Sequence, residues 1–281
     1  MHTRLVSADT LATRDPRADW LLLDVRHDLA NPTAGEQAYA QGHIPGAFFL
    51  HLDRDLSGAK NGRNGRHPLP ARADFAARMA ALGLTPATQV VAYDAQGGMF
   101  AARLWWMLRW LGHEAVAVLD GGLPAWTGAG HALDTDAPAP RSAATQYEAP
   151  SRVPVRHADE ILARLGDATQ LIVDARAADR FRGENETLDP VGGHIPGARN
   201  RFFKDNLEGD GRFKSAAQLR EEWQQVLGAT PPTEAVHQCG SGVTACHNLL
   251  ALEVAGLAGG MLYPGSWSEW CSEPSRPVER A

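Results

Sequence analysis

The feature of this sequence that most constrains its fold is an internal repeat. The hexapeptide GHIPGA occurs twice, and two further segments recur beside it in the same order. The matching segments are residues 42–47 with 193–198, 20–26 (WLLLDVR) with 170–176 (QLIVDAR), and 118–126 (VLDGGLPAW) with 262–270 (LYPGSWSEW). The offsets of 151, 150 and 144 residues are nearly constant, which indicates two copies of one domain.

The repeat also predicts where the two domains begin and end. We expect one domain at residues 1–135 and the other at residues 154–281. Residues 136–153 are rich in Pro, Ala and Ser, a composition typical of an extended linker rather than of a packed element.

Within each copy, apolar runs of strand length alternate with longer helical segments. The expected strands are 20–25, 89–94, 171–175 and 234–239, and the expected helices are 100–112 and 244–256. Strands that alternate with helices predict an α/β fold with a central, mostly parallel sheet flanked by helices, here duplicated in tandem. Ligands of such sheets bind at the carboxyl ends of the strands.

Composition excludes several classes of partner. The chain has 281 residues, of which 44% are hydrophobic, and a formal net charge of −6, so we expect no nucleic-acid partner. No apolar stretch reaches the roughly 18 residues of a membrane span, and the N-terminal residues lack the apolar core of a secretory signal. We therefore expect no membrane association and a cytoplasmic protein.

The three cysteines, Cys239, Cys246 and Cys271, are too few and odd in number for a disulfide framework. A metal site built from His237, Cys239, Cys246 and His247 would lack the usual spacing of zinc ligands. We therefore expect neither a metal nor an organic cofactor.

Cys239 lies where an expected strand ends and a helix begins, in the segment CGSGVT. Two glycines let the backbone turn several N–H groups inward, and the helix adds the positive end of its dipole. Both effects favour a thiolate at Cys239. A buried structural cysteine in a tight turn is the alternative. Alignment of the two copies puts Asp94 opposite Cys239, so only the second copy keeps a reactive sulfur.

The combination of CGSGVTA, two GHIPGA motifs, DGG and GSWSEW resembles the two-domain rhodanese family over nearly the whole chain. The resemblance implies thiosulfate or 3-mercaptopyruvate sulfurtransferase activity, with sulfur carried as a cysteine persulfide and ping-pong kinetics. It implies that Cys239 is the nucleophile and that Ser241 binds the sulfur or the substrate carbonyl. The residues whose backbone would cradle the sulfur are Gly240, Gly242, Val243 and Thr244.

The same resemblance implies residues that bind the sulfur donor. Arg180 matches the arginine that pairs with the substrate carboxylate, and Asp53 and His67 match polar residues contributed by the first domain. The expected partners are a small-molecule sulfur donor and an acceptor, which would be cyanide, a small thiol or a thioredoxin-like protein.

Two features of the sequence disagree on the donor. The CGSG loop has no cation after the cysteine, which favours the monoanionic 3-mercaptopyruvate over the doubly charged thiosulfate. Asp189, however, stands where mercaptopyruvate enzymes usually carry a second arginine. Arg182 and Arg201 are the candidates for the missing cation. We expect 3-mercaptopyruvate as the preferred donor, because the loop touches the reacting sulfur.

The same residues are compatible with other classes of protein to different degrees. A cysteine phosphatase needs Cys-x5-Arg, and residue 245 is Ala. A binding module would typically lack the cysteine, whereas a dedicated persulfide carrier would keep it. Arg26 and Arg176 are expected in structural ion pairs, His43 and His194 in turns, and Cys246 in a buried helix. Trp267 and Trp270 are expected to line the cleft.

Overall fold

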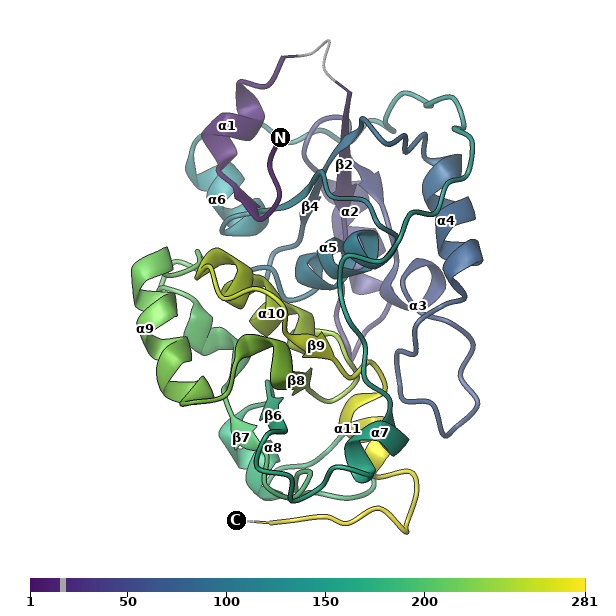
Figure 1. The fold of residues 1–281 in the computed structure, drawn as a ribbon. Coiled ribbons are helices and arrows are strands. Elements are labelled where there is room, and N and C mark those ends of the chain that lie inside the picture. Colours follow the sequence, from purple (N-terminus) through teal and green to yellow (C-terminus); the bar gives the residue numbers. More distant parts are fainter. Residues whose placement is uncertain (16–18, 281) are drawn as a thin grey trace. The chain divides into compact units, whose positions relative to one another are not determined.

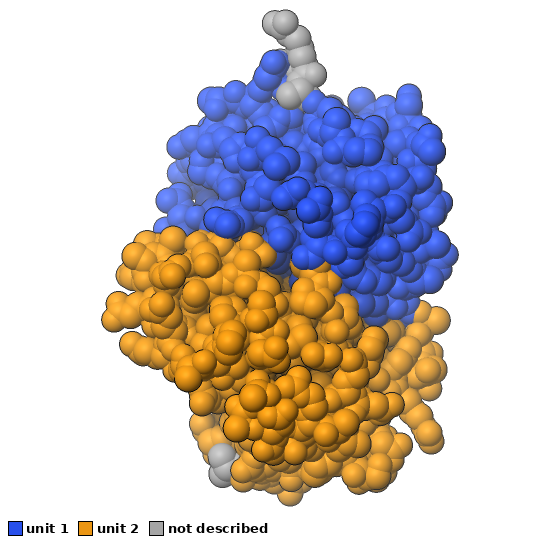
Figure 2. Space-filling view, viewed as in Figure 1, with its two compact units in different colours: residues 1–58, 69–152, 209–213 blue, residues 59–68, 153–208, 214–281 orange. Residues whose placement is uncertain are grey.

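The computed structural model describes residues 1–15 and 19–280, which form two compact units, coloured separately in Figure 2. The first unit comprises residues 1–58, 69–152 and 209–213, and the second comprises 59–68, 153–208 and 214–281. Two short segments thus belong to a different unit from their sequence neighbours. The segment 59–68 carries Arg66 and His67 into the second unit, which matters for the site described below.

The first unit is built on a parallel five-stranded sheet in the order β1-β5-β4-β2-β3. The strands are β1 (Leu5–Val6), β2 (Trp20–Asp24), β3 (Phe48–Phe49), β4 (Gln89–Tyr93) and β5 (Val116–Leu119). The helices are α1 (Ala8–Ala12), α2 (Ala34–Gln41), α3 (Leu52–Asp55), α4 (Arg72–Ala81), α5 (Ala101–Trp110) and α6 (Gly122–Gly128). The central strands β2 (WLLLD) and β4 (QVVAY) are mostly apolar and buried, which is typical of a sheet covered on both faces.

The second unit repeats this plan with a parallel four-stranded sheet in the order β7-β6-β8-β9. Its strands are β6 (Leu171–Asp174), β7 (Arg199–Asn200), β8 (Ala235–Gln238) and β9 (Met261–Leu262). Its helices are α7 (Ala158–Leu162), α8 (Ala178–Arg182), α9 (Ala216–Leu227), α10 (Thr244–Val254) and α11 (Ser266–Trp270), with 3-10 turns at Phe203–Asn206 and Pro232–Glu234. Helices α9 and α10 pack side by side (Figure 1). The duplicated α/β architecture is confirmed.

Strand register shows that the two sheets correspond residue by residue. Asp24 pairs with Tyr93 in the first unit, and Asp174 pairs with Gln238 in the second. The next residues along β4 and β8 are Asp94 and Cys239, so the register agrees with the sequence alignment of these two positions.

The predicted structural ion pairs are present in both units. In each, the arginine of the DVR or DAR segment binds the aspartate two residues earlier and donates to a glycine carbonyl at 2.7 Å. The two sets are Asp24, Arg26 and Gly42, and Asp174, Arg176 and Gly193. His43 and His194 are hydrogen-bonded as expected, since the Nδ1 atom of each lies 2.9 Å from a backbone carbonyl, but each lies in an isolated β-bridge rather than in a turn.

The expected linker has no helix or strand between residues 137 and 154. It is nevertheless fixed to the first unit, because Ala144 donates to the carbonyl of Ala80 and Arg152 donates to that of Arg109. Arg141 reaches the carbonyl of Leu82 at 3.1 Å. The segment therefore runs along one unit as an ordered strap.

Candidate active site

Cys239 is held by its backbone at the carboxyl end of β8. Its N–H donates to the hydroxyl of Ser266 at 3.1 Å, and its carbonyl accepts the N–H of Trp267 at 3.0 Å. The side chain is 2% exposed. Ser266 has a φ of 54°, and among the described residues other than glycine it is the only one with positive φ. A strained serine at the start of α11 thus fixes the position of the cysteine.

Gly242 turns the loop toward the sulfur. Its φ is +79°, and a Cβ at this position would lie 2.3 Å from the carbonyl oxygen of Pro264, so only glycine fits. Its N–H donates to the Sγ of Cys239 at 3.2 Å. The thiol of Cys246 donates to the carbonyl of Gly242 at 3.3 Å, so this buried cysteine of α10 supports the loop. Val243 and Thr244 complete the turn into the helix.

Gly240 leaves room for neighbouring side chains rather than for an unusual backbone angle, which sequence analysis missed. Its φ is not positive, but a Cβ would lie 2.7 Å from the Nη2 of Arg66. The Nη2 and Nη1 of Arg180 would lie 3.6 and 3.7 Å from the same point. Two guanidinium groups therefore approach the backbone beside Cys239, in space that any side chain would occupy.

Ser241 and His67 form a buried pair. The Nδ1 of His67 lies 2.7 Å from the Oγ of Ser241, and both side chains are less than 10% exposed. Segment 59–68 brings His67 to this position because the Arg66 N–H donates to the Oγ of Ser268 at 3.0 Å. The N–H of Ser268 in turn donates to the carbonyl of Gly240. One serine of α11 thus ties the histidine segment to the cysteine loop.

The cations around the loop are matched by buried carboxylates. Arg180 forks onto Glu186 with distances of 2.8 to 3.2 Å, and Arg176 contacts both Asp174 and Glu186. Burial alone would lower the pKa of Arg176, but Asp174, Glu186 and the nearby Cys239 raise it.

Arg66 also has a carboxylate partner, Asp189, whose side chain is 3% exposed. Asp189 lies 3.6 Å from Arg180 as well. Burial raises the pKa of Asp189, although Arg66 opposes the shift. Glu186 behaves oppositely: its burial is outweighed by Arg180, the Leu188 N–H and Arg176, and its pKa is lowered.

Two expected cations are not at the loop. Arg182 pairs with Glu184 on the exposed surface of α8, and Arg201 pairs with Glu222 and stacks on Trp223. The prediction that one of them supplies the missing cation is wrong. Arg66, which the sequence analysis did not single out, lies there instead. Its only sequence signal is its place immediately before His67, and nothing in the sequence marks Glu186.

The expectation for Trp267 and Trp270 is also wrong. Both side chains are fully buried in the hydrophobic core of the second unit. The ring of Trp267 lies 4.7 Å beneath the guanidinium of Arg176, so it supports the ion pairs from within the core.

Asp53, the remaining candidate, belongs to the first unit. It lies in α3, where its carboxylate is 4.0 Å from the Nε2 of His27 and 28% exposed. Cys239, Ser241, His67 and Arg180 all belong to the second unit, and a role for Asp53 stays a prediction.

The third cysteine, Cys271, lies in the hydrophobic core of the second unit. Burial, with Asp189 nearby, raises the pKa of the Cys271 thiol to about 11, so it stays protonated at neutral pH. Among the described residues no group of His, Cys, Asp and Glu has the arrangement of a metal site.

A sequence profile of the rhodanese-like domain matches residues 7–129 and 157–273. The chain belongs to the rhodanese family. It is 48% identical over 277 residues to a Pseudomonas aeruginosa protein named "Probable 3-mercaptopyruvate sulfurtransferase", which covers 98% of this chain and 97% of the relative. It is 34% identical to "Thiosulfate/3-mercaptopyruvate sulfurtransferase 2" of Arabidopsis thaliana, over 98% of this chain and 86% of the relative. This rhodanese is therefore a sulfurtransferase enzyme.

Solved structures agree with this assignment. The 3-mercaptopyruvate sulfurtransferase from Leishmania major superposes with a TM-score of 0.82 at 32% identity, over 98% of this chain and 75% of that one. The described part of this rhodanese contains no helix long and apolar enough to cross a membrane.

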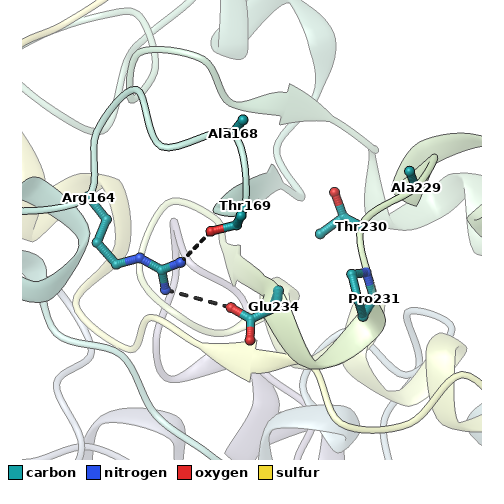
Figure 3. A pocket seen from close by; sticks show the side chains of 7 residues that line it. All are labelled: Arg164, Ala168, Thr169, Ala229, Thr230, Pro231 and Glu234. Carbon is teal, nitrogen blue, oxygen red and sulfur yellow. Dashed lines mark hydrogen bonds and ion pairs between the residues drawn. The ribbon is translucent and has the colours of Figure 1, made fainter.

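A separate cavity of about 480 Å³ lies in the second unit of this rhodanese. Figure 3 shows Arg164 beside it, bonded to Thr169 and Glu234. Residues 164–169 precede β6 and residues 229–234 precede β8, so the cavity is at the amino ends of the strands. Cys239 follows the carboxyl end of β8, and the cavity is therefore not part of the cysteine site.

Proposed function

We propose that this enzyme transfers sulfur from 3-mercaptopyruvate to a thiol or cyanide through a persulfide on Cys239. The observation that carries the proposal is the sulfur of Cys239 accepting the N–H of Gly242 beside the Ser241–His67 pair and Arg180. A negative sulfur gains from an N–H aimed at it and from the start of α10, as an oxyanion gains from its hole.

In the first step the Cys239 thiolate attacks the donor sulfur. A sulfur–sulfur bond forms, the carbon–sulfur bond of the donor breaks, and its electron pair passes to the pyruvate enolate. The proton of the donor thiol is transferred to the enolate carbon, which yields pyruvate and a Cys239 persulfide anion. The hydrogen-bonded pair of Ser241 and His67 supports this transfer, because a hydroxyl and an imidazole 2.7 Å apart can exchange a proton.

In the second step an acceptor thiol takes the outer sulfur. A new sulfur–sulfur bond forms on the acceptor, the bond to Cys239 breaks, and the Cys239 thiolate returns. Donor and acceptor visit the enzyme in turn, so initial rates at several fixed acceptor concentrations should give parallel double-reciprocal lines.

The charges at the loop support a monoanionic donor. Three guanidinium groups, those of Arg66, Arg176 and Arg180, meet three carboxylates, those of Asp174, Glu186 and Asp189. The balance is neutral, so the remaining N–H groups of the arginines can bind a single substrate carboxylate, while no net positive charge is left for a second negative charge. Thiosulfate is the second candidate donor, favoured by the proximity of two cations to Gly240.

Assignment of the domains follows from the same site. We propose that residues 154–281 form the catalytic domain and residues 1–135 a non-catalytic one, since Asp94 holds the position of the cysteine. The acceptor is proposed to be a small thiol or a thioredoxin-like protein. A cytoplasmic location is supported by three free cysteines, which suit a reducing compartment.

The test is sulfur transfer by the purified protein from 3-mercaptopyruvate and from thiosulfate, each with cyanide and with a small thiol. We expect a higher kcat/KM for 3-mercaptopyruvate, parallel lines, and no turnover by C239S, whereas the matched C271S keeps its activity. A higher kcat/KM for thiosulfate would overturn the donor, and intersecting lines would overturn the persulfide route.

A further inference from the structure

We infer that Arg66, aimed by Asp189, is the second arginine that binds the donor carboxylate and that this pair sets donor choice. The inference rests on the proposed function. It concerns a residue outside the cysteine loop and outside α8, in the segment 59–68 that joins the second unit.

The position of Arg66 is fixed at both ends. Its backbone N–H donates to the Oγ of Ser268, while a Cβ on the preceding Gly65 would lie 2.7 Å from the carbonyl oxygen of Gly265. The side chain ends on Asp189, which is almost fully buried. An arginine clamped in this way loses little side-chain entropy when it binds a substrate.

The orientation of the two guanidinium groups makes a carboxylate site. Asp189 is bound by Nη1 of Arg66, and Glu186 by Nε and Nη2 of Arg180. Nη2 of Arg66 and Nη1 of Arg180 both lie within 4 Å of one point beside Gly240. A carboxylate next to that point would meet a donor from each arginine, one residue from the nucleophile Cys239.

Asp189 thereby has a role opposite to the one its charge suggests. Asp189 stands where mercaptopyruvate enzymes usually carry a second arginine. In the structure it binds Arg66, holds this arginine at the loop and screens part of its charge. The pair offers directed N–H donors without adding net positive charge. This suits the single carboxylate of 3-mercaptopyruvate and gives the doubly charged thiosulfate no extra compensation.

The first test compares R66M with the matched control R63M, which removes an exposed arginine of the same segment. We expect R66M to raise the KM for 3-mercaptopyruvate about 30-fold with kcat changed less than about threefold, because a charge-assisted bond to the carboxylate is lost. R63M should match the unaltered enzyme. An unchanged KM in R66M, or an equal rise in R63M, would overturn the inference.

A second test does not depend on sulfur transfer. Alkylation of Cys239 by iodoacetate and by iodoacetamide compares an anionic reagent with a neutral one of similar size. We expect R66M to slow iodoacetate about tenfold relative to iodoacetamide, since only the former carries a carboxylate. An unchanged ratio would overturn the carboxylate site even if the enzyme transfers sulfur. If sulfur transfer fails with both donors while the ratio shifts, the proposed function fails and the anion site stands.

The role of Asp189 is tested with D189N, which removes its charge and keeps its shape. Without the Asp189 charge the positive charge of Arg66 is no longer screened, which favours the doubly charged thiosulfate. We therefore expect the ratio of kcat/KM for 3-mercaptopyruvate to kcat/KM for thiosulfate to fall about tenfold. In R66M/D189N the ratio should return toward that of R66M. A ratio that does not respond to D189N would show that the pair does not set donor choice.

Discussion

The loops that follow β4 and β8 occupy equivalent positions in the two units, but they carry different side chains, Asp94 and Cys239. In the first unit Asp94 fills its own loop, as its carboxylate accepts the N–H groups of Gln96, Gly98, Phe100 and Ala101 at 2.7 to 3.0 Å. In the second unit Cys239 places a sulfur at the same position. The first loop shows that this turn can direct several N–H groups at one side chain, and the second loop directs the Gly242 N–H at the sulfur of Cys239.

A second difference concerns the residue that fixes the loop from the last helix. The carbonyls of Asp94 and Cys239 both accept an N–H from that helix, at 2.8 Å from Leu123 and 3.0 Å from Trp267. The preceding residue has positive φ in both units, +57° in Gly122 and 54° in Ser266. Gly122 of the first unit adopts this φ without strain. Ser266 of the second unit is strained, and its hydroxyl accepts the N–H of Cys239.

The largest contrast should appear on removal of the two central side chains. C239A should lower kcat/KM by about 1000-fold or more, because the nucleophile is absent, while the free energy of unfolding changes by less than about 1 kcal/mol. Sulfur transfer and urea unfolding measure the two quantities. Residual turnover within tenfold of the unaltered enzyme would refute the role of Cys239.

D94N tests the other half of the comparison. A buried carboxylate with four N–H donors is replaced by an amide whose NH2 faces some of them, so we expect a loss of about 3 kcal/mol in the free energy of unfolding. The kcat of the folded protein should stay the same, since Asp94 lies in the first unit. A stability change below about 1 kcal/mol would show that the first loop is not organised around its carboxylate.

Two substitutions of Ser266 separate the effect of its backbone strain from the effect of its hydroxyl hydrogen bond. S266A keeps the unfavourable φ and loses the hydroxyl, so it should destabilise the protein by about 2 kcal/mol. S266G loses the hydroxyl but relieves the strain, as Gly122 does, and should cost about 1 kcal/mol less than S266A. Both should lower kcat by about tenfold, because the N–H of Cys239 loses its partner. Equal stability of the two variants would mean that Ser266 carries no strain.

A further difference between the two sheets concerns His237, whose equivalent in β4 is Ala92. His237 is fully buried against Trp223, and its ring nitrogens meet no hydrogen-bond partner among the described residues. Burial lowers its pKa from 6.5 to about 3. Below about pH 6.5 His237 therefore binds a proton in the unfolded chain but not in the folded protein. The free energy of unfolding consequently falls as the pH falls from about 6.5 toward 3.

H237L should remove this acid sensitivity. We expect its free energy of unfolding to fall less steeply with decreasing pH, by about 1.4 kcal/mol per pH unit at most, between about pH 6 and pH 4. Urea unfolding at several pH values measures the slope. Parallel slopes for the two proteins would show that His237 takes up its proton in the folded state.

Much of this architecture was accessible from sequence because it depends on local pattern. The GHIPGA repeat predicted the duplication, and the alternation of apolar runs with helical segments predicted both sheets. The requirement for glycine at 242 followed from the turn itself, as its φ of +79° confirms. These features arise from periodicity and backbone conformation, which neighbouring residues determine.

The position of Arg66 could not be read from sequence because it depends on long-range packing. Arg66 and Asp189 are 123 residues apart, and the exchange of segment 59–68 into the second unit has no local signal. For the same reason Gly240 was interpreted through backbone freedom, although guanidinium groups occupy the space of its missing side chain. Arg182 and Arg201 were plausible by proximity in sequence, yet each is held by its own glutamate elsewhere.

The most direct test of the central claim is the location of the sulfur after one half-reaction. The protein would be treated with 3-mercaptopyruvate without acceptor, its persulfides trapped by alkylation, and its peptides analysed by mass spectrometry. We expect one added sulfur atom, on Cys239, and none in C239S. Added sulfur on Cys246 or Cys271 instead, or an equal yield in C239S, would contradict it.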